Sequence, residues 1–386
     1  MAIYYDIHKA WLKKAGEELC GDQVKISRAG KRTIAVLSDG LGSGVKANIL
    51  ATLTAEIVST MIREGMPFKE VITTVIGTLP ECRERKLAYA TFTVLDIDEE
   101  SNGFKVINFD NPPVMLFREG RLLPLFEQKE IILGKEITLA EGEFEPGDFF
   151  ALLSDGILYA SEGEQLDFGW GWDEIARFAE EQAIPCGKRA RAIVDRVMEK
   201  TAALYNKRIG DDATFVGVLV RERKSLIIFT GPPLKEDSDE SYAKKFLGFE
   251  GRRVICGGTT ADIVGRYMGE EVKTDISTMS EEVPPVGELK GVDLVTEGIL
   301  TLAKTLPYLE GEYSERIART WPKNGAALLA QEMFRADHIH FLAGQTMNPY
   351  YQNPLLPKDM SIRTNLVKEL EKALRGLLKE VTLEFC

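Results

Sequence analysis

Residues 35–40 have the sequence Ala-Val-Leu-Ser-Asp-Gly, and residues 151–156 repeat this pattern as Ala-Leu-Leu-Ser-Asp-Gly. Each segment is a short apolar run, which predicts a buried strand, followed by an acidic residue and a glycine. An aspartate at a strand end is held rigidly while its carboxylate faces solvent, and the glycine permits a sharp turn. The repetition therefore predicts two strand ends that present one carboxylate each, Asp39 and Asp155.

Two further segments place aspartates beside apolar runs. The pair Asp211-Asp212 precedes an apolar run at residues 213–220, and Asp22 precedes a shorter run at 24–26. A single Asp-Gly pair is most often an ordinary turn, but several acidic strand ends in one chain favour a shared site. Carboxylates brought together without Arg or Lys neighbours repel one another unless cations neutralise them. Oxygen ligands suit Mg²⁺ or Mn²⁺, and two such ions can activate water for attack on phosphorus.

An amphipathic helix is expected directly after the first of these motifs. Its apolar residues recur every four positions and form one stripe, which we predict to be the buried face of the helix. The stripe consists of Ile49, Leu53, Ile57 and Met61. The rest of the first 220 residues is predicted to be strands interrupted by a few helices.

The pattern of elements changes after a charged cluster at residues 221–224. Beyond this cluster, predicted strands and helices alternate, which is typical of an α/β domain with a largely parallel sheet. We therefore expect two domains, at residues 1–222 and 223–386.

In the second half, one predicted strand leads into a helix through four residues, Gly257, Gly258, Thr259 and Thr260. Backbone amides at the start of that helix, together with two hydroxyls, form a candidate site for a small anion or a nucleotide phosphate. The alternative is that Thr259 or Thr260 is an ordinary N-cap after a glycine turn. Thr230 and Glu297 also follow predicted strands and are expected at the same edge of the sheet.

The composition limits the partners. Asp plus Glu is 60 against 48 Lys plus Arg, a net charge of -12, so neither nucleic acid nor an anionic membrane surface is an expected partner. No apolar run approaches the ~20 residues that cross a bilayer. The five cysteines form no Cys-x-x-Cys pair, and the first residues lack an apolar signal core. These features predict a cytoplasmic protein.

In their order along the chain, the motifs resemble the PPM family of metal-dependent Ser/Thr phosphatases, specifically its bacterial SpoIIE-like branch. The motifs are Gly-Asp at 21–22, Ser-Asp-Gly-Leu-Gly-Ser-Gly at 38–44, Asn-Pro-Pro at 111–113, Ser-Asp-Gly at 154–156 and Gly-Asp-Asp-Ala-Thr-Phe at 210–215. The resemblance implies an α-β-β-α sandwich, in which two antiparallel sheets are flanked by helices. No family is suggested for the second half.

The resemblance also implies a centre with two Mn²⁺ or Mg²⁺ ions. Asp39 would bridge both ions, and Gly40 would offer its carbonyl oxygen to one of them. Asp155 and Asp211 would bind the other ion.

Other positions are less firmly matched to the family pattern. Asp22 corresponds to an early acidic position near the metal centre, and Asp212 competes with Asp211 as a ligand. No phosphate-binding arginine of the eukaryotic kind is identifiable, and Arg28 and Arg32 are only nearby candidates.

The implied reaction is hydrolysis of phosphoserine or phosphothreonine by direct attack of a hydroxide that bridges two ions, without a phosphoenzyme. The implied setting is bacterial regulatory signalling. The partner would be a phosphorylated protein, with an anti-sigma-antagonist-like regulator as one candidate. Two alternatives remain open: a non-catalytic binding module with the phosphatase fold, and a phosphatase gated by a C-terminal domain that senses a small molecule.

Overall fold

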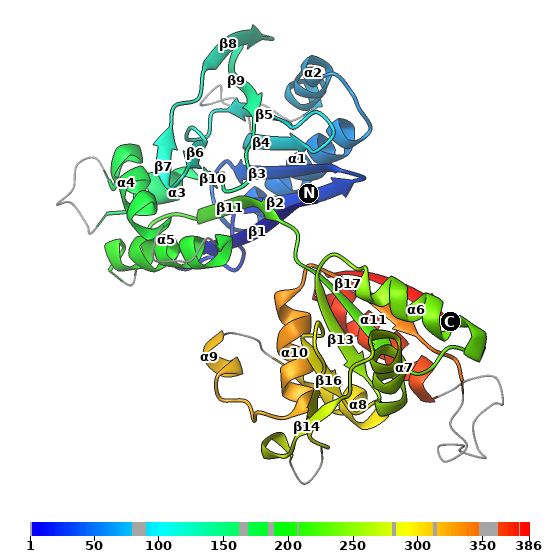
Figure 1. Cartoon of the computed structure of the whole chain (residues 1–386). Helices are drawn as coiled ribbons and strands as arrows, with labels where there is room; N and C mark the ends of the chain where they lie inside the picture. Colours follow the sequence, from blue (N-terminus) through cyan, green and yellow to red (C-terminus); the bar gives the residue numbers. More distant parts are fainter. Residues whose placement is uncertain are drawn as a thin grey trace. The chain divides into compact units, whose positions relative to one another are not determined.

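The computed structural model describes residues 2–78, 90–161, 169–183, 189–206, 208–279, 283–311, 315–346, 362–377 and 379–386. The chain divides into two compact units, Met1–Glu222 and Arg223–Cys386 (Figure 1). Cys20, Cys256 and Cys386 are buried free thiols, whereas Cys82 and Cys186 lie outside the described residues.

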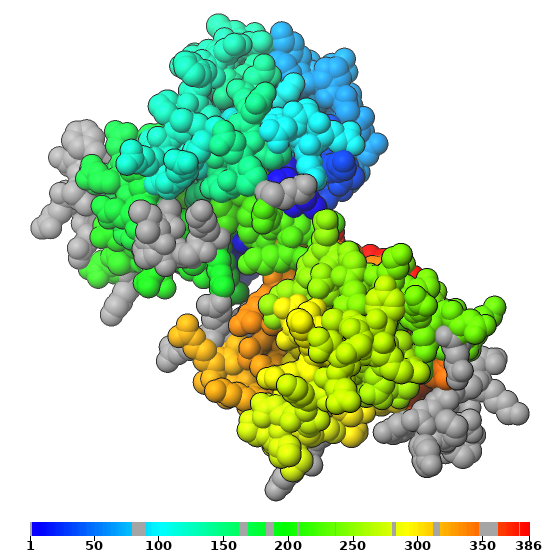
Figure 2. Space-filling model, viewed as in Figure 1, coloured from blue at the N-terminus to red at the C-terminus, as the bar shows by residue number. Residues whose placement is uncertain are grey.

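The first unit contains two antiparallel sheets. One has five strands in the order β1-β11-β10-β6-β7, with bounds Ile3–Leu12, Ala213–Glu222, Phe149–Leu153, Met115–Arg118 and Arg121–Leu123. The other has six strands in the order β2-β3-β4-β5-β9-β8, with bounds Asp22–Ala29, Arg32–Gly40, Ala90–Asp98, Gly103–Phe109, Lys135–Glu143 and Glu127–Ile132. Strand β8, at one edge of the second sheet, is exposed at the surface (Figure 2).

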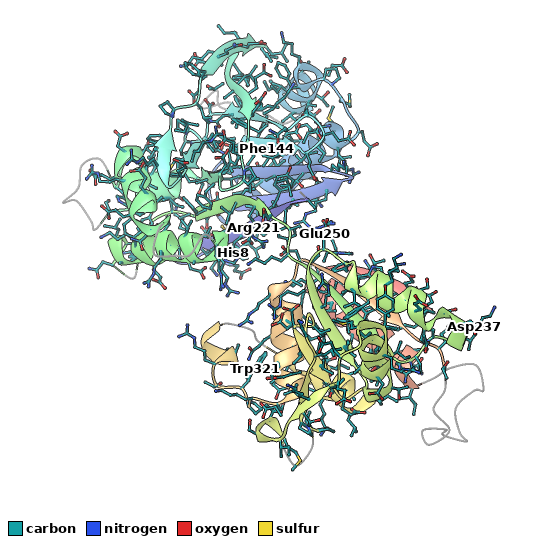
Figure 3. The ribbon with its side chains drawn as sticks, viewed as in Figure 1. His8, Phe144, Arg221, Asp237, Glu250 and Trp321 are labelled. Atoms are coloured by element: carbon teal, nitrogen blue, oxygen red, sulfur yellow. The ribbon has the colours of Figure 1, made fainter. Side chains whose placement is uncertain are left out.

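The two sheets pack face to face around a shared core. Strand β3 shows why its sequence is apolar throughout: Ala35 and Leu37 face the core between the sheets, and Ile34 and Val36 face the helices outside. Phe144 also lies in the core between the sheets and packs edge-on against Tyr5, with ring centroids 5.9 Å apart (Figure 3). Burial on both faces removes the usual polar alternation, so β3 is a continuous hydrophobic run.

Helices cover the outer face of each sheet. Helices α1 (Gly44–Arg63) and α2 (Phe68–Thr78) pack on the six-stranded sheet, and α4 (Trp172–Ala183) and α5 (Ala190–Leu204) pack on the five-stranded one. The short helix α3 (Asp155–Leu158) directly follows β10. The unit is therefore an α-β-β-α sandwich of two antiparallel sheets, as the motifs predicted.

The buried face of α1 differs from the prediction. Ile49 and Leu53 are 52% and 51% exposed, and the face against the sheet is formed mainly by small residues such as Ala47 and Ala51. A Cβ atom on Gly40 would lie 2.1 Å from the carbonyl oxygen of Ala47, so the helix backbone approaches the sheet too closely for large side chains there. The first half of the predicted stripe is therefore exposed, whereas Ile57 and Met61 pack against the core on this sheet.

Helix α1 also bears on the question of membrane spans. Among the described helices, it is the one long and apolar enough to span a bilayer, although 39% of its apolar window is buried inside this unit. Core helices of soluble proteins share these properties.

The second unit is built on a seven-stranded sheet in the order β14-β15-β16-β13-β12-β17-β18. The bounds in that order are Lys273–Asp275, Val286–Glu288, Leu294–Thr296, Arg252–Cys256, Ser225–Thr230, His338–Ala343 and Glu380–Phe385. Strands β16, β13, β12, β17 and β18 are parallel to one another, and β14 and β15 form an antiparallel edge. This mixed, mostly parallel sheet confirms the predicted fold class.

Helices pack on both faces of this sheet. Helices α6 (Asp239–Leu247) and α7 (Gly258–Met268) cover one face, and α8 (Ile299–Glu310), α10 (Gly325–Arg335) and α11 (Ile362–Gly376) cover the other. The remaining helical elements are α9 (Glu315–Ala318) and two short 3₁₀ turns, at Glu236–Ser238 and Ile276–Thr278.

Candidate metal centre

The sandwich brings the predicted acidic residues to one end of its two sheets. Asp22, at the start of β2, lies opposite Asp39, at the end of β3. Asp155 follows β10, and Asp211 lies just before β11, which pairs with β10. The hydroxyl of Ser154 donates to Oδ2 of Asp22 at 2.7 Å and so joins the two sheets at this point.

The carboxyl groups at this end are close enough to affect one another's titration. Burial is the main cause that raises the pKa of Asp39, and the charges of Asp22, Asp155 and Asp211 raise it further. Burial also raises the pKa of Asp155, with the charge of Asp211 as the next cause, and Asp39 and Asp155 share a hydrogen bond. A shared proton is the usual way for two adjacent carboxylates to relieve their repulsion in the absence of a cation.

Asp22 is the most deeply buried of these acids. Its side chain is 4% exposed, and burial raises its pKa to about 6. Oδ2 accepts the Ser154 hydroxyl, but Oδ1 is buried and has no hydrogen-bond partner among the described residues. The charges of Asp212 and Asp155 raise this pKa further, and a cation would neutralise a buried carboxylate among other acids.

The two neighbouring aspartates before β11 have different surroundings. Both carboxylate oxygens of Asp212 are occupied by backbone donors: N–H of Gly21 at 2.8 Å and N–H of Lys14 at 3.0 Å. The Asp211 side chain is 48% exposed, accepts from the N–H of Asp212 at 3.0 Å, and lies 3.4 Å from Nζ of Lys14. Asp212 therefore holds the segment between β1 and β2 against the loop before β11. An oxygen of Asp211, by contrast, remains available to bind a cation.

Lys14 was not foreseen in the sequence. The acidic motifs were expected to meet without a basic neighbour, yet the ammonium of Lys14 stands beside Asp211. No local pattern marks it, because Lys14 and Asp211 are 197 residues apart and meet only in the folded chain.

The glycines of the two Ser-Asp-Gly motifs are required by close backbone contacts. A Cβ atom on Gly156 would lie 2.0 Å from the carbonyl oxygen of Asp212, much as one on Gly40 would meet Ala47 at 2.1 Å. The carbonyl of Gly156 also accepts the Tyr205 hydroxyl at 2.5 Å. Each glycine thus lets the chain after its aspartate pass directly against a second segment.

The Asn-Pro-Pro motif lies beside β4. Thr91 is paired with Asp39 across the β3–β4 ladder and donates its hydroxyl to the side-chain oxygen of Asn111. The side-chain nitrogen of Asn111 is buried without a hydrogen-bond partner among the described residues. Asn111 is therefore linked to the acidic cluster through Thr91, the residue paired with Asp39.

The two arginine candidates lie away from the acidic cluster. In the β2–β3 hairpin, Asp22 and Asp39 are at the open end, and Arg28 and Arg32 are at the turn, about 20 Å away for six residues of strand. Arg32 forms a salt bridge to Asp96 at 2.5 Å, and Arg28 donates to a backbone carbonyl. Neither arginine is placed to bind a phosphate at the acidic end.

The donor set fits hard divalent cations, because it consists of carboxylate and backbone oxygens. Within the described ranges, no group of three or more His, Cys, Asp or Glu side chains is already arranged around a point that would hold a metal ion.

The family model described as Stage II sporulation protein E (SpoIIE) matches residues 29–221. The chain belongs to the SpoIIE family. Over 211 residues it is 22% identical to stage II sporulation protein E of Bacillus subtilis (strain 168), a match that takes in 54% of this chain and 24% of that protein. The chain thus matches about a quarter of the length of that relative. The resemblance inferred from the motifs is confirmed for the first unit, which carries the SpoIIE family match.

The chain is also similar to solved structures of low sequence identity. One contains the PP2C phosphatase domain and a fragment of the regulatory domain of SpoIIE from Bacillus subtilis, with 20% identity, a TM-score of 0.49, and coverage of 57% of this chain and 64% of that one. Another is RsbX in complex with magnesium, with 18% identity, a TM-score of 0.41, and coverage of 56% of this chain and 95% of that one. The SpoIIE family match ends at residue 221 and does not reach the second unit.

Proposed function

We propose that the first unit removes phosphate from phosphoserine or phosphothreonine in a regulatory protein of a bacterial signalling pathway, with two Mg²⁺ or Mn²⁺ ions as cofactors. The observation that carries the proposal is the buried, unpartnered Oδ1 of Asp22 beside Asp39 and Asp155. Family membership supports the substrate class, and the relative RsbX is described in complex with magnesium. An anti-sigma-antagonist-like regulator remains our candidate partner.

Each acidic residue has its own part in this proposal. Asp39, at the centre of the mutual interactions, would bridge the ions, with the carbonyl of Gly40 beside it. Asp155 and the more exposed Asp211 would hold the second ion. Asp212 is fully engaged by backbone donors, so we assign it to positioning the loop and not to direct coordination.

Divalent cations, when bound, lower the pKa of a water molecule and neutralise charge that develops on the transferred phosphoryl group. The chain itself supplies a rigid frame for them. Ser154 orients the Asp22 carboxylate, and the N–H groups of Gly21 and Lys14 lock Asp212. Transfer of the phosphoryl group directly to water requires no nucleophilic side chain, so the proposal needs none of these aspartates as a phosphate acceptor.

A phosphatase assay with and without metal tests the proposal. The purified chain is given p-nitrophenyl phosphate and a phosphoserine peptide, with Mn²⁺, with Mg²⁺ and with EDTA. Turnover should require the metal, and Asp39→Asn should lower it by about 10³-fold, since several kcal/mol of transition-state stabilisation are lost.

The matched control is Asp98→Asn, an acid on β4 outside the cluster, which should leave turnover unchanged. Metal-independent turnover, or equal turnover in Asp39→Asn, would contradict the proposal. An inactive protein that still binds Mn²⁺ at the Asp39 cluster would favour the non-catalytic alternative.

A further inference from the structure

The second unit has the strand order of a doubly wound fold. Strand β12 lies at the middle of the parallel strands. The chain proceeds outward from it through β13 to β16, then returns to β17 on the other side and continues to β18. The connections from β12 and from β17 therefore lead off in opposite directions. In open α/β sheets, ligands bind beyond the carboxyl ends of strands at such a switch point.

Gly231, directly after β12, is the common neighbour of the groups at this edge. Its φ of +78° is accessible mainly to glycine. A Cβ atom there would lie 2.2 Å from Nη1 of Arg363, in the first turn of α11. On its other side, the N of Gly231 lies 3.9 Å from the position that a Cβ atom of Gly257 would occupy. The ends of β12 and β13 and the start of α11 thus converge on one small region.

Helix α7 begins in this region without a side-chain cap. Gly257 is its N-cap, with φ +135°, so no N-cap side chain accepts a hydrogen bond from the first amides of the helix. Neither Thr259 nor Thr260 is the N-cap, so the ordinary capping alternative is wrong. The first backbone N–H groups of a helix have no intrahelical acceptors, and α7 begins beside Gly231, whose N lies close to Gly257.

Two buried threonine hydroxyls lie at this edge of the sheet. Thr260 and Thr230 are both 0% exposed, and neither hydroxyl has a hydrogen-bond partner in the described part of the chain. Oγ1 of Thr260 lies 3.3 Å from the position of a Cβ atom on Gly257, so it is directed at the start of α7. Thr230 alternates with Leu226 and Ile228, which face α11, so its hydroxyl lies on the side of Arg363.

Arg363 supplies positive charge to the same place. Its Nη1 donates to the carbonyls of Gly344 at 3.0 Å and Thr346 at 3.2 Å, which fixes the guanidinium in position. Its Nε is buried without a partner among the described residues, and burial lowers the pKa of the guanidinium. The charge of Cys386 raises this pKa, but the acceptors of Nη1 are neutral carbonyls, so an anion would add a hydrogen-bonded counter-charge.

Glu297 is a nearby acidic residue whose charge also raises the pKa of Arg363. Its Oε2 accepts from the N–H of Leu300 at 2.9 Å and of Thr301 at 3.3 Å, so it caps the start of α8. The carboxylate of Glu297 therefore caps the start of α8, whereas the N-cap of α7 supplies no such group.

We propose that the carboxyl edge of this sheet binds the phosphate group of a small molecule, held by the first amides of α7, the hydroxyls of Thr230 and Thr260, and the guanidinium of Arg363. All of these groups can donate hydrogen bonds, and together with the helix terminus they favour a compact anion with several acceptor oxygens. The phosphate is either free or part of a nucleotide. This site is independent of the proposed phosphatase reaction.

Calorimetric titration of the full chain with inorganic phosphate and with AMP tests the site. EDTA is present throughout, and the titrations are repeated in Asp39→Asn, so that binding at the acidic cluster of the first unit does not contribute. Thr230→Val and Thr260→Val should each weaken binding about tenfold, the loss of one hydrogen bond to a charged group. Both variants should remain as thermally stable as the wild type without ligand, because the lost hydroxyl has no partner.

The matched control is Thr305→Val. Thr305 is also 0% exposed, but its hydroxyl donates to the carbonyl of Thr301 at 2.7 Å. This variant should lose stability and retain phosphate binding. Tighter binding of AMP than of phosphate would identify a nucleotide as the source, and binding of phosphate alone would identify the free ion. No binding of either probe at millimolar concentration, or equal affinity in both valine variants and the wild type, would overturn the proposal.

Discussion

The hydroxyl of Ser154 lies 2.7 Å from Oδ2 of Asp22, although the two residues are 132 positions apart in the chain. Oγ of Ser154 also accepts the backbone N–H of Thr214 at 2.8 Å. One hydroxyl therefore connects the start of β2, the end of β10 and the start of β11. The serine of the second Ser-Asp-Gly motif orients the acidic end of the sandwich and is more than a turn residue.

Replacing this serine tests the connection. Ser154→Ala leaves an N–H group and a carboxylate oxygen buried without partners, so the free energy of unfolding should fall by about 2 kcal/mol. The metal concentration needed for half-maximal turnover should rise, because Asp22 is no longer oriented. Urea denaturation and a Mn²⁺ titration of activity measure the two effects. Ser161→Ala, at a half-buried position after α3, serves as the control, and a Ser154→Ala protein of unchanged stability would contradict the assignment.

Replacement by asparagine should affect the two adjacent aspartates before β11 differently, with the larger loss of stability at one and the larger loss of turnover at the other. Asp212→Asn sets a side-chain amide against a backbone N–H group, which should lower the free energy of unfolding by about 2 kcal/mol. Asp211→Asn should change stability by less than about 0.5 kcal/mol, since its side chain is half exposed. It should nevertheless reduce metal-dependent turnover more strongly. Paired urea and activity measurements decide, and the reverse pattern would exchange the two roles.

The glycines after Asp39 and Asp155 should not tolerate a methyl group. Gly40→Ala and Gly156→Ala place a Cβ atom about 2 Å from a carbonyl oxygen, so each should destabilise the first unit by about 3 kcal/mol. Gly77→Ala is the matched control, because Gly77 lies exposed in α2 with no atom within 4 Å of the added carbon. The control should be neutral or slightly stabilising. Thermal denaturation compares the three variants, and equal behaviour would refute the close approach.

The second unit should lose stability on mild acidification. His338 and His340 lie on one face of β17, and burial lowers the pKa of both imidazoles. Because the folded-state pKa lies below the unfolded one, the unfolded chain takes up protons first as pH falls from about 7 to about 5, and the free energy of unfolding decreases. Glu384, 3.2 Å from His340, opposes the effect, so the loss should be about 1 kcal/mol or less.

Urea denaturation at several pH values measures this dependence. The double variant His338→Gln, His340→Gln should flatten it for the second unit. His8→Gln, in the first unit, should leave it unchanged. A double variant with the same pH dependence as the wild type would show that other groups are responsible.

Much of the fold could be predicted because its determinants are local. The apolar run before Asp39 and its repeat before Asp155 identified buried strand ends, and the alternation of strands and helices after residue 224 identified an α/β unit. These patterns depend on periodicity and turn chemistry within a few residues, which a sequence displays directly.

Other properties depended on contacts between distant residues. The stripe from Ile49 to Met61 has the right spacing for a core face. Ala47 and Ala51 nevertheless face the sheet, because the missing side chain of Gly40 lets the helix backbone lie close to the strand. Spacing along a helix identifies a possible face but not how near the neighbouring sheet will lie.

For this protein, the sequence by itself determined that acidic strand ends recur, in an order that matches a phosphatase family, and that an α/β unit follows. Only the tertiary structure decided that Asp212 accepts from the amides of Gly21 and Lys14, that Lys14 stands beside Asp211, and that Thr230 and Thr260 are buried without partners among the described residues. The physical reason is that a hydrogen-bond donor or a charge acts across a few ångströms of space, whatever its separation along the chain.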